Sequence, residues 1–146
     1  YIHKLTNDKV AVKIMEKILV TKLDVSRYKK EIYMIKLSAT QYRERQVDFE
    51  DNERIYVCFE YLKGGELFQE VNAKKKACKK YTEKQSARII GQVIKAVDYL
   101  HQNYIIHRDV SLENIMYVHG GANHGSGRIK LIDFGTACKF SGANSE

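Results

Sequence analysis

Alternating apolar and polar residues predict two β-strands in the first part of the chain. Residues 10–14 (Val-Ala-Val-Lys-Ile) and 54–60 (Arg-Ile-Tyr-Val-Cys-Phe-Glu) are rich in β-branched and aromatic side chains. Because side chains alternate between the two faces of a strand, Ala11 and Lys13 are expected on one face, opposite the two valines. Turn residues precede each strand, so residues 1–4 are expected to form a hairpin with the first one.

Helical spacing of apolar residues predicts three helices. Residues 24–37 and 82–102 show this spacing, and a shorter helix is expected to begin near Glu66. Thr82 and Gln85 match the capping-box pattern, which defines the start of the longest helix. The apolar stripe expected along that helix is Ile90, Val93, Ile94, Val97 and Leu100.

Glycine-rich segments divide the rest of the chain. Lys63-Gly64-Gly65 marks a boundary between two subdomains. Residues 115–118 and 129–132 are predicted strands, and the glycine-rich segment 119–127 connects them. The histidines of that segment have no third ligand nearby, so we interpret them as solvent-exposed and not as metal ligands.

Composition excludes some classes of protein and limits the rest. The 146 residues suit one domain, and the absence of a long apolar run excludes a membrane span and argues for no membrane partner. The formal net charge is +7, with lysines concentrated at positions 74–76 and 79–80. No aromatic stacking pattern accompanies them, so a solvated helix end is favoured and no nucleic-acid partner is expected. Three cysteines without metal spacing indicate a reduced intracellular, cytoplasmic location.

Two short motifs carry the chemistry. The segment His107-Arg108-Asp109 is followed five positions after the aspartate by Asn114, and Asp133 opens an Asp-Phe-Gly motif further on. Their spacing matches the catalytic-loop and metal-loop pattern of protein kinases. The chain therefore resembles a eukaryotic-type protein kinase catalytic domain, with the serine/threonine type favoured.

The resemblance implies a partial two-lobe α+β fold. Residues 1–62 would form an incomplete β-rich N-lobe with the hinge, and residues 63–146 the first part of the helical C-lobe, with ATP between them. Asp109 would be the catalytic base that receives the proton of a protein hydroxyl, and Asn114 and Asp133 would bind Mg²⁺.

The resemblance also implies which residues would bind the nucleotide. Lys13 would bind the phosphates and pair with Glu31 of the following helix. Ala11 and Met116 would cover the two faces of the adenine. The backbone of Glu60 and Leu62 would face its edge, and Glu66 would lie near the ribose. Phe59 would be the gatekeeper, with His107 and Phe134 as packing residues.

The sequence also departs from the family pattern. The glycine-rich loop that covers the phosphates would lie before Tyr1, and the substrate-binding helices would follow Glu146. Because those later elements normally bury the helix over residues 82–102, part of its apolar stripe is expected to stay exposed, which would suit a partner that covers the helix. Ser111 stands where these kinases carry a lysine beside the transferred phosphoryl group, and Arg45 falls where a buried spine residue is expected. A start without methionine suggests a piece of a longer protein or an incomplete gene model.

These departures leave more than one function open. The favoured hypothesis is a protein kinase truncated at both ends, inactive or nearly so by itself, whose full-length parent phosphorylates proteins. The alternative is a pseudokinase-like module that binds nucleotide or scaffolds without catalysis. A small-molecule kinase of similar fold is less favoured, because Val-Ala-Val-Lys with His-Arg-Asp resembles protein kinases more closely.

Overall fold

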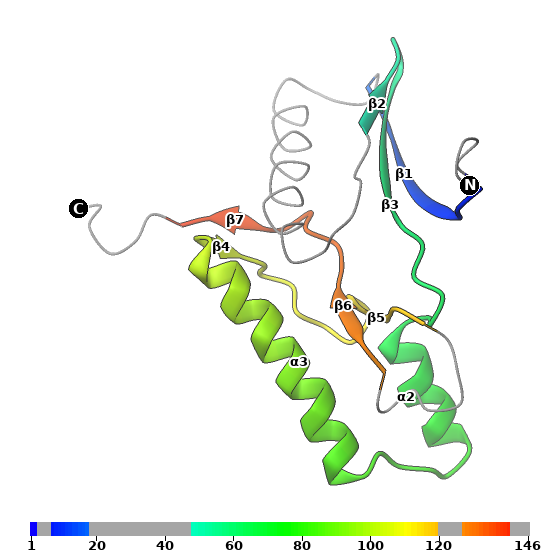
Figure 1. Cartoon of the computed structure of the whole chain (residues 1–146), viewed down its shortest axis with the longest axis vertical. Helices are drawn as coiled ribbons and strands as arrows, with labels where there is room; N and C mark the ends of the chain where they lie inside the picture. Colours follow the sequence, from blue (N-terminus) through cyan, green and yellow to red (C-terminus); the bar gives the residue numbers. More distant parts are fainter. Residues whose placement is uncertain (3–6, 18–47, 120–126, 141–146) are drawn as a thin grey trace. The chain divides into compact units, whose positions relative to one another are not determined.

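A computed structural model describes residues 1–2, 7–17, 48–119 and 127–140 of the chain (Figure 1). The chain divides into two compact units, residues 1–61 and 62–146. This division falls one residue before the boundary expected between two lobes. The helix predicted over residues 24–37, which carries Glu31, lies outside the described residues, as do Arg45 and His124.

The first unit contains a three-stranded antiparallel sheet in the order β1-β3-β2. Its strands are β1 (Val10–Glu16), β2 (Asp48–Glu50) and β3 (Arg54–Glu60). The two longer strands confirm the sequence predictions, whereas β2 was not predicted. A strand of three residues is too short to show an alternating pattern, so its pairing with β3 defines it.

The register of β1 and β3 decides which side chains share a face of this sheet. Ala11 lies opposite Phe59, and Lys13 lies opposite Val57. Directly opposed residues project from the same face. That face carries the small core of the unit, in which Phe59 packs against the buried Ile55 and Val57. The predicted adenine, phosphate and gatekeeper residues therefore belong to one face of the sheet.

The predicted N-terminal hairpin is present where residues 1–2 and 7–9 are described. Ile2 and Lys9 form an isolated antiparallel bridge. The backbone N–H of Val10 donates to the C=O of Tyr1 (2.9 Å), and the terminal ammonium of Tyr1 donates to the C=O of Val10 (3.0 Å).

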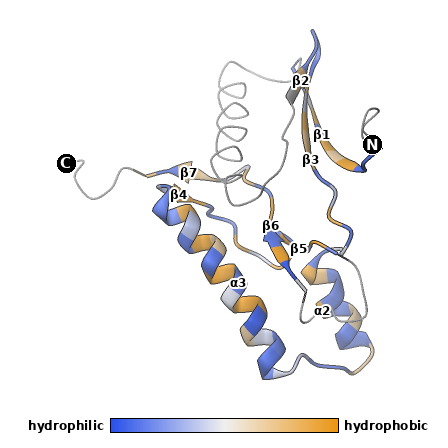
Figure 2. Ribbon diagram, in the orientation of Figure 1, coloured by the Kyte–Doolittle hydropathy of each residue, from blue (hydrophilic) through white to orange (hydrophobic). Residues whose placement is uncertain are grey.

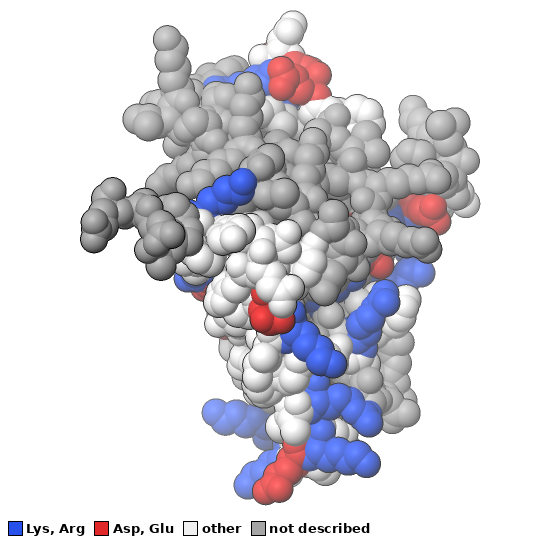
Figure 3. Space-filling view, turned by 60° about the vertical axis from the view of Figure 1, so that its left-hand side comes forward, with Lys and Arg blue, Asp and Glu red and all other residues white. Residues whose placement is uncertain are grey.

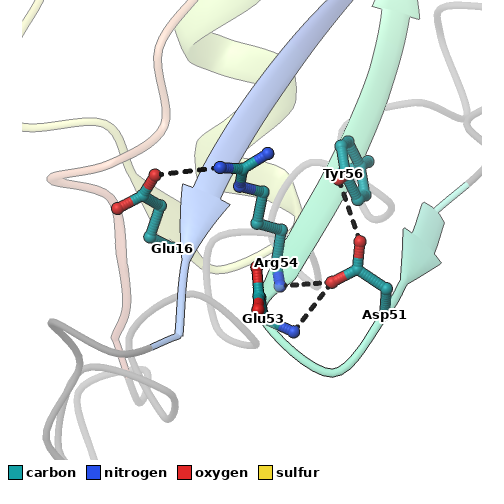
Figure 4. A network of polar contacts seen from close by, with 5 residues as sticks. All are labelled: Glu16, Asp51, Glu53, Arg54 and Tyr56. Atoms are coloured by element: carbon teal, nitrogen blue, oxygen red, sulfur yellow. Dashed lines mark hydrogen bonds and ion pairs between the residues drawn. The ribbon is translucent and has the colours of Figure 1, made fainter.

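The predicted turn before β3 is built around Asp51 (Figure 4). Its Oδ1 accepts hydrogen bonds from the backbone N–H of Glu53 (2.8 Å) and Arg54 (2.6 Å), and its Oδ2 accepts one from the hydroxyl of Tyr56 (2.9 Å). These donors, the Glu53 N–H first, hold the pKa of Asp51 below its ordinary value. The carboxylate thus connects the turn to the strand that follows it.

Replacing Asp51 by Ala is expected to lower the midpoint of thermal unfolding, because two backbone N–H groups and one hydroxyl lose their acceptor. Differential scanning fluorimetry measures the change. Asn52→Ala is the matched control, since Asn52 is an exposed residue of the same turn. Equal midpoints for the two variants would show that the carboxylate does not stabilise the turn.

The second unit contains two helices and two small sheets. Helices α2 (Leu67–Lys76) and α3 (Glu83–Gln102) confirm the predictions, and the capping box of Thr82 and Gln85 is formed in full. Strand β5 (Ile115–Tyr117) pairs antiparallel with β6 (Ile129–Leu131), as the two predicted strands suggested. Strands β4 (Ile105–Ile106) and β7 (Cys138–Lys139) pair in the same sense, and neither was predicted.

The residues that α3 buries are not all members of the predicted apolar stripe. Ile90 and Ile94 are 56% and 61% exposed, whereas Ile89, which the prediction left out, is buried. The physical reason is Gln92, whose side chain donates to the C=O of Gly127 (3.0 Å) and accepts from the N–H of Ile129 (3.1 Å). Because this amide faces β6, the helix is rotated from the orientation that its apolar residues alone suggest. Part of the stripe is exposed, as expected, and Figure 2 shows the apolar residues spread along α3.

The core of the second unit lies between α3, the start of α2 and the two small sheets. Its most buried side chains include Leu67, Leu100, Ile105, Tyr117 and Val118. In the described parts of the chain, none of the helices has the length and apolar content needed to cross a membrane.

Candidate functional site

The segment between β4 and β5 carries the His-Arg-Asp motif and closes on itself through Asn114. The side-chain amide of Asn114 donates to the backbone C=O of Asp109 (3.0 Å) and to its carboxylate Oδ2 (2.8 Å). Asp109 is exposed and Asn114 half-buried. Two predicted site residues, five positions apart, are therefore in direct contact, and the carboxylate of Asp109 is held at the surface.

His107 anchors this loop to the buried interior of the unit. Its side chain is buried (3% exposed), and its ring lies 5.0 Å from the ring of Phe134. Nδ1 accepts from the backbone N–H of Asp109 (3.3 Å), so the neutral ring donates from Nε2 to the C=O of Ile132 (3.1 Å). Burial lowers the pKa of His107, in keeping with a neutral ring. Both His107 and Phe134 are packing residues, as expected.

The Asp-Phe-Gly segment lies next to Asn114. The backbone N–H of Ile132, the residue before Asp133, donates to the C=O of Asn114 (2.8 Å). Asp133 has a left-handed backbone (φ 59°), and its Oδ1 accepts from the N–H of Gly135 (3.2 Å). Aspartate tolerates this conformation better than most residues. The two residues predicted to bind a metal therefore sit on adjoining segments of the chain.

A second link between the two loops was missed by sequence reasoning. Arg108 has φ 68°, and its Nε donates to the C=O of Thr136 (2.5 Å). The hydroxyl of Thr136 donates to the C=O of His107 (2.9 Å). These bonds join residues 28 and 29 positions apart, and no local pattern in the sequence signals them. Together with the β4–β7 pairing they hold the Asp-Phe-Gly segment against the catalytic loop.

Two predicted nucleotide-binding residues meet at β5. Glu66 forms an isolated antiparallel bridge with Met116. The backbone of Tyr117 makes two hydrogen bonds to the preceding glycines. The N–H of Gly64 donates to the C=O of Tyr117 (3.0 Å), and the N–H of Tyr117 donates to the C=O of Gly65 (2.9 Å). Within the described residues, the backbone N–H and C=O of Leu62 make no hydrogen bond. These groups can therefore serve a ligand, as an adenine edge would require.

The remaining predicted residues belong to the first unit. Ala11 and Lys13 lie on β1, on the face that also carries Phe59, and Glu60 ends β3. Glu31 is outside the described residues, so its pairing with Lys13 stays a prediction.

The oxygen donors of the second unit fit a magnesium ion. Asn114 uses its amide nitrogen on Asp109, which leaves its Oδ1 as the atom for a cation. Asp133 offers a carboxylate. Among the described residues no group of three or more His, Cys, Asp or Glu is arranged to hold a metal. Mg²⁺ in phosphoryl-transfer sites needs only one or two protein oxygens, because phosphates and water supply the rest.

The buried His107 predicts a pH dependence of stability. In the unfolded chain it takes up a proton near its ordinary pKa of 6.5, whereas the folded pKa is lower. The unfolded state therefore binds more protons as the pH falls below this value, and the free energy of unfolding decreases on acidification. Urea unfolding at a series of pH values measures this slope. We expect His107→Phe to reduce the slope and His119→Gln, at an exposed position, to leave it unchanged; equal slopes for all three proteins would contradict the assignment.

Comparison with known proteins agrees with this geometry. A family model described as protein kinase domain matches residues 1–145. A probable myosin light chain kinase of Dictyostelium discoideum is 31% identical, over 96% of this chain and 34% of the relative. The maternal embryonic leucine zipper kinase of Danio rerio is 37% identical, over 96% of this chain and 19% of the relative. A serine/threonine-protein kinase H1 homolog of Pinctada fucata is 31% identical, over 96% of this chain and 31% of the relative.

The chain spans between 19% and 34% of the length of these three relatives. Its strands and helices fit part of a kinase-like α+β fold, and its motif residues meet in one loop cluster. The chain therefore belongs to the protein kinase domain family.

Proposed function

We propose that the full-length parent of this chain is a protein serine/threonine kinase and that the second unit holds its catalytic centre. The observation that carries the proposal is the contact of Asn114 with Asp109, beside the segment that carries Asp133. This arrangement supports a centre in which the carboxylate of Asp109, held by Asn114, lies beside residues that can offer oxygen atoms to Mg²⁺. Phosphoryl transfer needs this combination of an acceptor for the hydroxyl proton and neutralised phosphate charge.

Each polar residue has a distinct role in this proposal. Bound Mg-ATP supplies the phosphoryl group and the cation that neutralises its charge. Asp109 orients the substrate hydroxyl and accepts its proton at the carboxylate. Asn114 and Asp133 hold the magnesium ion, and Lys13 binds the phosphates with Glu31 as its partner.

The adenine contacts in this proposal are those that the family resemblance implies. Ala11 and Met116 cover the two faces of adenine, and the backbone N–H and C=O of Leu62 bind its edge together with the C=O of Glu60. Glu66, bridged to Met116, lies where the ribose hydroxyls would be. The substrate is a serine or threonine hydroxyl of a protein. We place the protein inside the cell, since its three cysteines form no disulfide with one another in the described part of the chain.

A pseudokinase-like module that binds nucleotide or scaffolds is the second candidate. Ser111 favours it, because a lysine at this position would contribute a cation beside the transferred phosphoryl group. The contacts of Asp109 and Asn114 favour catalysis, because a scaffold does not require a positioned carboxylate. Both candidates allow nucleotide binding, so binding and transfer have to be measured separately.

Mg-ATP is expected to stabilise this chain against thermal unfolding. A ligand at about 100 times its Kd adds about 2.7 kcal/mol to the free energy of unfolding. Asp133→Asn should lose most of this gain and its dependence on magnesium, because the amide is a weaker ligand for a hard cation. A thermal-shift titration with ATP, with and without magnesium, measures both effects.

The matched control is Asp98→Asn, which neutralises an exposed carboxylate on α3 that accepts from Gln102 (2.8 Å). It should respond to Mg-ATP as the unmodified chain does. An unmodified chain that shows no shift would rule out nucleotide binding by this chain. Equal shifts for Asp133→Asn and Asp98→Asn would rule out the role of Asp133 only.

A further inference from the structure

The strongest charge asymmetry of the second unit lies where α2 ends and α3 begins. Residues 70–88 contain seven Lys and Arg residues but only two Glu residues, a net charge of +5 out of +7 for the whole chain. Figure 3 shows blue side chains gathered at this end of the unit, with little red among them. The positive charge of the chain is therefore concentrated on one surface of one unit.

One of these cations is directed inward and is not part of the surface. The Nζ of Lys74 lies 3.5 Å from Oε1 of Glu70, one helical turn away, and 4.7 Å from the centre of the Tyr81 ring. Glu70 is largely buried, so one of the two carboxylates of the segment is already used in the fold. Glu83 is then the one exposed carboxylate of residues 70–88.

The other cations are exposed and form what we call the α2–α3 basic surface: Lys75, Lys76, Lys79, Lys80, Lys84 and Arg88. In the described part of the chain, these six side chains make no ion pair. Lys75 and Lys76 lie in the last turn of α2, where they complement the helix dipole. That effect accounts for two of the cations but not for those in the loop and at the start of α3.

The residues around this surface distinguish between three classes of polyanionic ligand: nucleic acid, a lipid membrane and an acidic protein segment. Binding of single-stranded nucleic acid usually adds aromatic stacking, but Tyr81 is half-buried and one face of its ring lies under Lys74. Membrane attachment usually adds large apolar side chains that enter the lipid. The exposed ones nearest in sequence are Phe68 and Ile90, and none occurs between Lys75 and Arg88. An acidic protein segment needs only exposed cations, and these are present.

We propose that the α2–α3 basic surface binds an acidic, Asp- or Glu-rich segment of a partner protein. Long lysine side chains can follow an extended acidic segment without a preformed pocket. Such binding depends on charge and weakens as salt is added. The proposal concerns binding alone and does not require the chain to catalyse phosphoryl transfer.

A binding assay with matched charge variants tests this. The probe is a fluorescein-labelled peptide of alternating Glu and Ser, titrated with the whole chain and followed by fluorescence anisotropy. One variant combines Lys75→Glu, Lys79→Glu and Lys80→Glu. Its control combines Lys63→Glu, Lys95→Glu and Arg128→Glu, which are also exposed and give the same net charge. A third variant replaces the same three lysines, Lys75, Lys79 and Lys80, by Gln. It removes their charge without reversing it, so the test remains valid if reversed charge at the end of α2 impairs folding.

We expect the first variant to bind the peptide about tenfold more weakly and the control to bind as the unmodified chain does. The Gln variant should show a smaller loss, and added salt should weaken the binding of the unmodified chain. Equal losses in variant and control would overturn the proposal, because net charge alone would then explain binding. So would a failure to bind the peptide, whether or not the chain binds a single-stranded oligonucleotide or phosphatidylserine vesicles.

Discussion

Replacing Asp109 by Asn in the full-length parent is expected to lower kcat for peptide phosphorylation by about 10²–10⁴-fold, the usual contribution of a positioned acid or base. The amide preserves the size of the side chain and can still accept from Asn114, which now donates to Oδ2 of Asp109 (2.8 Å). It cannot take up the proton of the substrate hydroxyl. The loss should therefore appear in kcat, with the Kd for Mg-ATP little changed. Transfer of labelled phosphate to a serine peptide measures the first, and a thermal-shift titration the second.

Glu113→Gln is the control for Asp109→Asn. Glu113 is an exposed carboxylate of the same loop, so its neutralisation changes the local charge equally. We expect it to retain the activity of the parent. A parent that binds Mg-ATP but transfers no phosphate would favour the pseudokinase-like alternative. Peptide phosphorylation by this chain alone, abolished by Asp109→Asn, would contradict our expectation that the isolated chain is inactive or nearly so.

Replacing Gly64 by Ala is expected to destabilise the second unit by about 1–3 kcal/mol, the range for overpacking. A methyl group there would collide with Cβ of Tyr117 and lie 2.6 Å from its C=O oxygen and 2.7 Å from that of His119. Tyr117 is 1% exposed and its backbone is hydrogen-bonded to Gly64 and Gly65. The strand has little room to move, so the backbone beside Glu66 and Met116 must shift. Urea unfolding monitored by circular dichroism measures the loss.

Gly91→Ala is the opposite case in the same unit. Gly91 lies within α3, and a methyl group there would have open space around it. Alanine in a helix interior is favoured over glycine, so this variant should be more stable by about 0.5–1 kcal/mol. If Gly64→Ala were as stable as Gly91→Ala, the close approach of residue 64 to β5 would not constrain the second unit.

The features that sequence reasoning predicted correctly depend on neighbours along the chain. The two long strands follow from side-chain alternation over residues 10–14 and 54–60, and the first one extends to Glu16 in the structure. The start of α3 follows from the capping box of Thr82 and Gln85, which needs only three residues of spacing. The family follows from the order of Asp109, Asn114 and Asp133, because a motif of fixed spacing is recognisable without coordinates.

Other features depend on contacts between residues distant in sequence. Strands β4 and β7 have two residues each, and each is a strand only because the other pairs with it. Which residues of the α3 stripe stay exposed was not predicted. Ile90 and Ile94 are exposed, and the polar side chain of Gln92 faces β6 and bonds to Gly127 and Ile129. The lysine-rich sequence alone does not define the α2–α3 basic surface. Lys74 turns toward Glu70 and Tyr81, so it does not belong to that surface.

The sequence by itself determined the family and the long elements, and it identified the residues that we propose to be catalytic, because each of these is encoded in local spacing. Tertiary structure decided how those residues are held. The bonds from Asn114 to Asp109, from His107 to Ile132 and from Arg108 to Thr136 bring two loops into one site. The last two bonds span 25 and 28 residues, and residues so far apart meet only when the chain between them has folded.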